Sequence, residues 1–160
     1  MDRLWTPWRY QYVTSGVADD GCIFCQKPAD SDDRANLIVH RAERNFVLLN
    51  LFPYNSGHLM IAPYEHTGTL EACAQETAAE LFELTRRCEA ILRREYRAQG
   101  VNLGMNIGAV AGAGVAGHIH MHVVPRWTGD ANFMSVTGET RVLPEDLHTT
   151  WARMRAAFGD

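Results

Sequence analysis

The feature that most constrains the fold is a long stretch without charge. No Asp, Glu, Lys or Arg occurs between Ala98 and Pro125. Such a length could span a bilayer, and Gly104, Gly108 and Gly112 match the small-xxx-small spacing of membrane helices. The same stretch contains asparagines and histidines, which are costly in a hydrocarbon core. Two buried strands joined by a glycine-rich loop fit it better, and we therefore expect no membrane span.

The rest of the chain has the patterns of antiparallel strands and one long helix. The expected strands are Asn36–His40, Asn45–Leu51, Gly57–Pro63, Val101–Ile107 and His118–Pro125. From Leu70 to Gln99, apolar residues recur every three or four positions, which predicts an amphipathic helix ended by Gly100. A short final helix is expected from Leu143, whereas residues 1–35 are expected to be irregular. This order of elements predicts an α+β fold.

Composition narrows the class of protein. At 160 residues, with 46% hydrophobic and 21% charged residues, the chain is expected to form one domain with a real core. Its net charge of −4 disfavours nucleic acid as a partner. The first residues lack the apolar core of a signal peptide, and four cysteines are too few for a disulfide scaffold. We therefore expect a reducing, cytoplasmic compartment.

Three histidines alternate in the last predicted strand. Because alternate strand residues share a face, His118, His120 and His122 are expected to form a row, with Ile119 and Met121 toward the core. The outer two would lie roughly 13 Å apart at about 3.3 Å per residue, so one metal ion does not suit all three. Imidazoles with separate roles suit phosphoryl chemistry better, either as nucleophile or as donor to phosphate oxygens. The alternative is a metal patch or a row of plain surface histidines.

Cys22 and Cys25 form a Cys-x-x-Cys motif. Such a pair is half of a zinc site, a redox pair, or two buried reduced thiols. No thioredoxin-like strand precedes it, which disfavours redox use, and zinc would require two further ligands.

The chain has a segment from Asn50 through Gly57-His58 and later the motif His118-x-His120-x-His122, which two valines follow. In these features it resembles the histidine triad (HIT) family, over roughly residues 36–126. The flanks Leu4–Arg9 and Gly129–Met134 are similar to those of bacterial members often labelled diadenosine polyphosphate hydrolases or phosphorylases. The resemblance implies one HIT domain over residues 1–160, with an N-terminal extension of about 35 residues and a C-terminal tail from about residue 127. It also implies a homodimer in which two five-stranded antiparallel sheets join into one ten-stranded sheet.

The resemblance further implies roles for the histidines. His120 would attack the α-phosphorus of a nucleotide and carry a nucleotidyl-histidine intermediate. His122 and His58 would hold phosphate oxygens, and His118 would orient His120 through its backbone carbonyl. Because a neutral nucleophile needs a charged helper in this scheme, we expect His122 or His58 to be protonated near neutral pH, which predicts a bell-shaped pH profile.

The resemblance places Asn50 near the ribose and Asn106 near the phosphates. Many members carry a hydroxyl residue in the loop before the first histidine, where this chain has Ala113 and Gly114. The backbone N–H groups of Gly114 and Val115 are expected to substitute for that hydroxyl. Mg²⁺ is expected to arrive with the nucleotide.

The resemblance also completes the metal site. Some bacterial members pair a Cys-x-x-Cys near the N-terminus with two histidines, which correspond here to His66 and His118. A structural zinc held by Cys22, Cys25, His66 and His118 follows.

The expected function is that of an enzyme, a nucleotide hydrolase or phosphorylase that cleaves dinucleoside polyphosphates. One alternative is a phosphoramidase-type hydrolase of adenosine monophosphate–amine conjugates. The other is a non-catalytic, zinc-stabilised nucleotide-binding protein.

Overall fold

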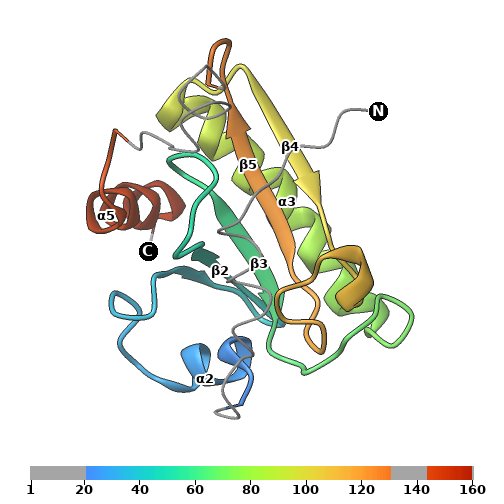
Figure 1. Ribbon diagram of the computed structural model, residues 1–160. Helices are drawn as coiled ribbons and strands as arrows, with labels where there is room; N and C mark the ends of the chain where they lie inside the picture. The colour runs from blue at the N-terminus through green and yellow to red at the C-terminus, as the bar shows by residue number, and fades with distance from the viewer. Residues whose placement is uncertain (1–20, 131–143, 160) are drawn as a thin grey trace, which may run out of the picture.

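The computed structural model describes residues 21–130 and 144–159. The strands are β1 (Ile38–Arg41), β2 (Asn45–Leu49), β3 (Leu59–Pro63), β4 (Gly100–Gly104) and β5 (Met121–Arg126). The helices are α2 (Ile23–Ala29), α3 (Gln75–Tyr96), the 3₁₀ turn η1 (Ala109–Ala111) and α5 (Leu147–Phe158). The strands form one antiparallel sheet in the order β1-β2-β3-β5-β4 (Figure 1). The α+β prediction is confirmed.

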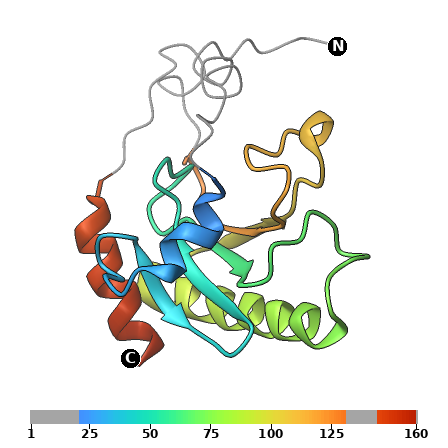
Figure 2. The same cartoon turned by 90° about the horizontal axis from the view of Figure 1, so that it is seen from below.

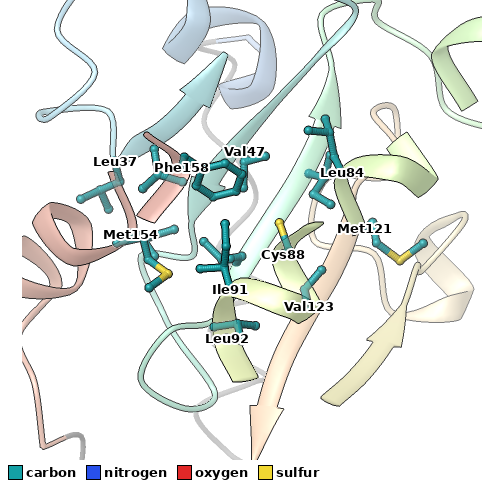
Figure 3. Close-up of a cluster of buried hydrophobic side chains, with 14 of the residues drawn as sticks. Leu37, Val47, Leu84, Cys88, Ile91, Leu92, Met121, Val123, Met154 and Phe158 are labelled. Carbon is teal, nitrogen blue, oxygen red and sulfur yellow. The ribbon is translucent and has the colours of Figure 1, made fainter. Parts of the chain in front are cut away.

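One face of the sheet packs against α3 and α5 and holds the main core. Alternate residues of the strands point to this face, as the period of a strand requires. The cluster includes Val47, Leu59, Ile61, Met121 and Val123 from the sheet with Leu84, Cys88, Ile91, Leu92, Met154 and Phe158 from the two helices (Figure 3). The apolar residues that recur along α3 all lie on the side that packs against the sheet. Their burial accounts for the helical period in the sequence.

The intervening strand residues form a smaller cluster on the opposite face. Phe46, Leu48 and Met60 lie there against Phe24 of α2. Figure 2 shows α2 and α3 on opposite sides of the sheet. Because both faces of the central strands are apolar, these strands read as continuous hydrophobic runs.

The expectation that residues 1–35 are irregular is wrong for Ile23–Ala29, which form α2. This helix has seven residues and contains Pro28 in its last turn. A helix this short gives too few turns for a periodic signal, and its stability comes from tertiary packing of the buried Phe24.

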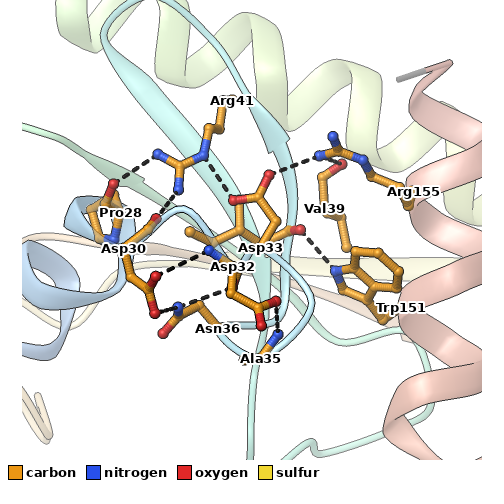
Figure 4. A network of polar contacts seen from close by, with 11 residues as sticks. Pro28, Asp30, Asp32, Asp33, Ala35, Asn36, Val39, Arg41, Trp151 and Arg155 are labelled. Carbon is orange, nitrogen blue, oxygen red and sulfur yellow. Dashed lines mark hydrogen bonds and ion pairs between the residues drawn. The ribbon is translucent and has the colours of Figure 1, made fainter.

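The loop after α2 is fastened to the sheet by arginine. Arg41 donates to Asp33 Oδ1 and to the carbonyls of Pro28 and Asp30, each at 2.8 Å (Figure 4). Arg155 of α5 reaches the other oxygen of Asp33 at 3.2 Å. These bonds hold the loop between α2 and β1 against both the sheet and the C-terminal helix.

Several element boundaries differ from the expectations. Helix α3 begins at Gln75 and ends at Tyr96, and Arg97 takes the left-handed C-cap conformation (φ 51°) that Gly100 was expected to provide. Helix α5 begins only at Leu147, because Asp146 caps it by accepting from the backbone N–H groups of residues 148 and 149. Strand β5 begins at Met121, so His118 and His120 precede it. None of the helices described here combines the length and the hydrophobicity that a membrane span requires.

Candidate functional site

The histidine row lies where the chain leaves its glycine-rich loop and enters β5. The N–H of Ile119 donates to the carbonyl of Thr67 at 2.7 Å, which fixes the backbone between the first two histidines. His118 and His120 are buried, with 1% and 5% of their surface exposed, and His122 is half-buried. All three come to the face that carries Phe24, while Met121 and Val123 belong to the core beneath α3.

A backbone carbonyl fixes the proton of His120. The ring atom Nδ1 lies 2.9 Å from the carbonyl oxygen of His118. A carbonyl can only accept, so Nδ1 carries the hydrogen and Nε2 keeps its lone pair. The arrangement gives a neutral imidazole whose free nitrogen is a nucleophile.

A second chain of hydrogen bonds fixes His58 and His122. The backbone N–H of Tyr54 donates to His58 Nδ1 at 3.1 Å, so the ring hydrogen of His58 lies on Nε2. That Nε2 lies 3.0 Å from His122 Nδ1 and donates to it. The hydrogen of neutral His122 therefore lies on Nε2, which makes this atom a hydrogen-bond donor, and the His122 ring centroid lies 4.9 Å from that of His120.

Burial disfavours the charged form of His120 and of His122. It lowers the pKa of His120, although the hydrogen bond to the His118 carbonyl opposes that effect. The pKa of His122 is lowered to about 4, first by burial and then by the nearby His120 ring. The expectation that His122 is protonated near neutral pH is therefore wrong for the free protein, because a charged ring would be poorly solvated here.

Phe24 packs directly on the ring of His120. Its ring centroid lies 4.6 Å from that of His120 and 5.3 Å from that of His118. This side chain excludes water from one side of the row and limits the rotation of the His120 ring. Because Phe24 lies between Cys22 and Cys25, it also connects the row to the cysteine motif.

Four predicted metal ligands come together. The donor atoms of Cys22, Cys25, His66 and His118 all lie within 4.8 Å of one another. His118 Nδ1 lies 3.3 Å from the Cys22 sulfur, and His66 Nδ1 lies 3.3 Å from the Cys25 sulfur. With ligand bonds of about 2.0–2.3 Å, the donors of a tetrahedral zinc ion lie roughly 3.5 Å apart. The cluster therefore fits a metal ion of that size.

The hydrogen bonding of His118 supports ligation. Its Nε2 donates to the carbonyl of Pro63 at 2.9 Å, which leaves Nδ1 bare and directed at the cysteines. Metal-bound histidines usually donate their second ring N–H in this way. His118 thus offers its side chain to the metal cluster and its carbonyl to His120.

The predicted nucleotide-binding residues lie after β2 and in and before the glycine-rich loop. Asn50 follows β2, and its Oδ1 accepts from the N–H of Phe52 at 3.0 Å. Asn106 donates to the carbonyl of Gly112 at 3.3 Å and thereby fixes the glycine-rich loop. Within the described residues, the N–H groups of Gly114 and Val115 donate to no backbone carbonyl, so they remain suited to an anion. The predicted flanking motif at residues 4–9, and residues 131–134 of the motif Gly129–Met134, lie outside the described residues.

Sequence reasoning missed Tyr54, Phe24 and Pro63. Two of them act through backbone atoms: the N–H of Tyr54 and the carbonyl of Pro63. Because every residue has these backbone groups, residue type does not reveal where such a contact forms. Phe24 looks like any core aromatic, and only its place between the two cysteines pointed to the site.

Comparisons with known proteins agree with this geometry. Residues 32–129 match the sequence model of the HIT domain. The "AP-4-A phosphorylase" of Mycobacterium tuberculosis (strain H37Rv) is 38% identical, over 96% of this chain and 86% of that protein. "Protein hit" of Bacillus subtilis is 29% identical over 80% of this chain and 88% of that protein. A solved "ZN-bound histidine triad family protein from Mycobacterium smegmatis" superposes with a TM-score of 0.70 at 27% identity, over 87% of this chain and 94% of that one. With its histidine row at the start of β5 and its sequence matched over most of its length, the chain belongs to the HIT family.

Proposed function

We propose that this protein is a nucleotidyl-transferring enzyme that cleaves dinucleoside polyphosphates, releasing a nucleoside monophosphate unit through a nucleotidyl-histidine intermediate. The observation that carries the proposal is the tautomer of His120, whose Nδ1–H is held by the His118 carbonyl while Nε2 keeps its lone pair. The name of the M. tuberculosis relative supports this substrate class.

The first half of the reaction uses His120 as nucleophile. Its Nε2 attacks the α-phosphorus, an Nε2–P bond forms, and the bond from phosphorus to the bridging oxygen breaks. The carbonyl of His118 stabilises the positive charge that develops on the ring, because it accepts the Nδ1–H bond throughout. In the second half an acceptor oxygen attacks the same phosphorus and His120 is released.

His122 supports this chemistry as a neutral donor. In our proposal its Nε2–H binds a phosphate oxygen, and the bond from His58 prevents the alternative tautomer. No proton has to be taken up from solvent at neutral pH. We further propose that Asn50 contacts the ribose, and that Asn106 and the loop N–H groups contact the phosphates.

The nucleophile is tested by substitution and by mapping the adduct. His120→Ala should lower turnover of diadenosine tetraphosphate by about four orders of magnitude or more, as for other lost nucleophiles. His148→Ala, which changes an exposed histidine at the start of α5, is the matched control and should keep full activity. Mass spectrometry after rapid quenching should find the nucleotidyl group on His120. An adduct on His118 or His122 would overturn the assignment.

The same assay separates the alternatives. Wild-type protein should release products from diadenosine tetraphosphate faster than from an adenosine monophosphate–amine conjugate. The reverse preference would favour a phosphoramidase, and no turnover of either would favour a binding protein.

We also propose that the cysteine–histidine cluster holds a structural Zn²⁺. The Cys₂His₂ donor set is typical of structural zinc, and four protein ligands leave no position for a reactive water. The zinc-bound M. smegmatis protein supports this choice of metal. Such a site needs reduced cysteines, which fits a cytoplasmic protein. Mg²⁺, if required, would accompany the polyphosphate.

A homodimer through β4 completes the proposal. This strand forms one edge of the sheet, and its Leu103 is 50% exposed. Unpaired edge strands readily pair with a second copy, which would extend the sheet to ten strands.

A further inference from the structure

A groove of about 360 Å³ lies beside His122, over the β4 edge of the sheet. Its walls include Tyr54, Asn102, Asn106 and Arg126. Gly104 lies directly across from His122 in the β4–β5 pairing, and a Cβ placed on it would meet no atom within 4 Å. The groove is therefore open next to the His122 ring.

The far end of this groove carries a fixed cation. Arg126 donates through Nε and one terminal nitrogen to both oxygens of Asp130, at 2.6 and 2.7 Å. Its other terminal nitrogen donates to Asn102 Oδ1 at 2.9 Å. These bonds use three of the five guanidinium N–H groups. The others, together with the Asn102 amide, are donors of the kind that bind phosphate oxygens.

The order of the strands gives the groove a direction relative to the reaction. Asn50 directly follows β2 and continues the alternation of Phe46 and Leu48, which lie on the face of the histidine row. The row lies at the start of β5, and the groove lies over β4, beyond β5 as seen from β2. A nucleoside near Asn50 and an α-phosphorus at His120 thus direct the rest of the substrate toward the groove.

We propose that this groove binds the nucleoside polyphosphate that leaves in the first half-reaction, and then the inorganic phosphate that accepts the nucleotide in the second. The inference rests on the proposed function. In-line attack places leaving group and acceptor on the same side of the phosphorus, opposite His120 Nε2. A phosphate oxygen forms the new bond to phosphorus as the Nε2–P bond breaks, and a nucleoside diphosphate is released.

The chemistry of the groove favours phosphate over water as acceptor. An anionic phosphate oxygen attacks without losing a proton, whereas water must give one up. Asp130 is the carboxylate bound to Arg126, and it accepts from four N–H groups: two of Arg126, one of Asn55 and the backbone N–H of Trp127. A carboxylate held in this way is a weak base. The groove thus offers anion-binding donors, while the carboxylate paired with its arginine is unsuited to activate water.

The test compares a large and a small leaving group. The substrates are diadenosine tetraphosphate and the p-nitrophenyl ester of adenosine monophosphate, each with varied inorganic phosphate. The variants are Asn102→Ala and Arg126→Gln. Arg93→Gln is the matched control, since Arg93 is about as exposed as Arg126 (49% and 44%) and also forms an i,i+4 ion pair, with Glu89. Circular dichroism and melting curves check that each variant is folded.

Asn102→Ala and Arg126→Gln should raise the KM for inorganic phosphate and for diadenosine tetraphosphate at least tenfold. The rise in the KM for the nitrophenyl ester should be at least fivefold smaller. The product should shift from adenosine diphosphate toward adenosine monophosphate. Arg93→Gln should change none of these values. Equal losses on both substrates, or an unchanged KM for phosphate, would overturn the subsite. If wild-type protein forms no nucleotidyl-histidine with either substrate, the proposed function itself fails.

Discussion

Each of His58, His118, His120 and His122 has one ring nitrogen in a hydrogen bond to a neighbouring group. That bond fixes the tautomer and so determines what the other ring nitrogen can do. Carbonyl oxygens hold His118 and His120, whereas the backbone N–H of Tyr54 orients His58, which in turn orients His122. The three histidines at positions 118, 120 and 122 therefore each present a different ring atom for further contacts. His118 presents Nδ1, His120 presents a bare Nε2, and His122 presents Nε2–H.

The lowered pKa of His122 predicts how stability depends on pH. The ring titrates near pH 4 in the folded protein and near 6.5 when unfolded, so the unfolded chain binds more protons between these values. The free energy of unfolding should therefore fall as pH drops from 6.5 toward 4, with a contribution from this ring of up to about 1.4 kcal/mol per pH unit. Above pH 6.5 the contribution should be constant.

Urea unfolding of wild type and His122→Asn across this range checks the prediction. The asparagine variant should have the shallower pH dependence, and parallel curves would contradict the assignment. The same neutral state predicts that turnover falls on acidification and shows no alkaline limb that depends on His122.

At the scale of elements, short apolar runs beside turn residues predicted the strands, the helical period predicted α3, and alternation predicted the histidine row. These signals arise from burial, which selects residue type directly. Helix α2 was not predictable, because a seven-residue helix depends on the packing of Phe24. The tautomers were also beyond the sequence, apart from the His118 carbonyl implied by the family resemblance, since the backbone groups at Tyr54 and Pro63 fix them.

The cluster of Cys22, Cys25, His66 and His118 joins the start of α2 to the rest of the fold. Loss of its metal should therefore lower the stability of the fold more than it lowers activity. Cys22→Ser should remove the bound zinc and lower Tm by roughly 5–10 °C, because lost metal sites cost about 2–3 kcal/mol or more in a chain of this size. Activity per folded molecule should change less, since His120 keeps its carbonyl partner.

Elemental analysis and melting curves with and without chelator provide the measurement. Cys73→Ser is the control, because Cys73 is a buried cysteine outside the cluster and its variant should retain zinc. Equal zinc contents in wild type and Cys22→Ser would refute the site.

On the scale of the whole molecule, the main core and the candidate site lie on opposite faces of the sheet. Its α3 face holds the larger core, and its other face carries the histidines, the metal cluster and the groove. The active face reaches the β4 edge, where we expect the second subunit. In the proposed dimer, the subunit interface and the reaction site would therefore lie at the same edge of the sheet.

Leu103→Lys tests that border. A lysine on an edge strand disfavours pairing with another strand, so the variant should weaken the dimer at least about tenfold and keep its fold, because Leu103 is already half exposed. Analytical ultracentrifugation over a dilution series measures this. Wild-type protein that sediments as a monomer at every concentration would rule out the proposed dimer.

The double use of His118 has a consequence for how such proteins diverge. Its side chain faces the metal cluster, but the group that orients His120 belongs to the main chain. Any amino acid at position 118 supplies that carbonyl. A descendant could exchange this histidine, abandon the metal and strengthen its fold by other means while retaining the nucleophile. An insertion between positions 118 and 120 has no such tolerance, because it would displace the acceptor itself.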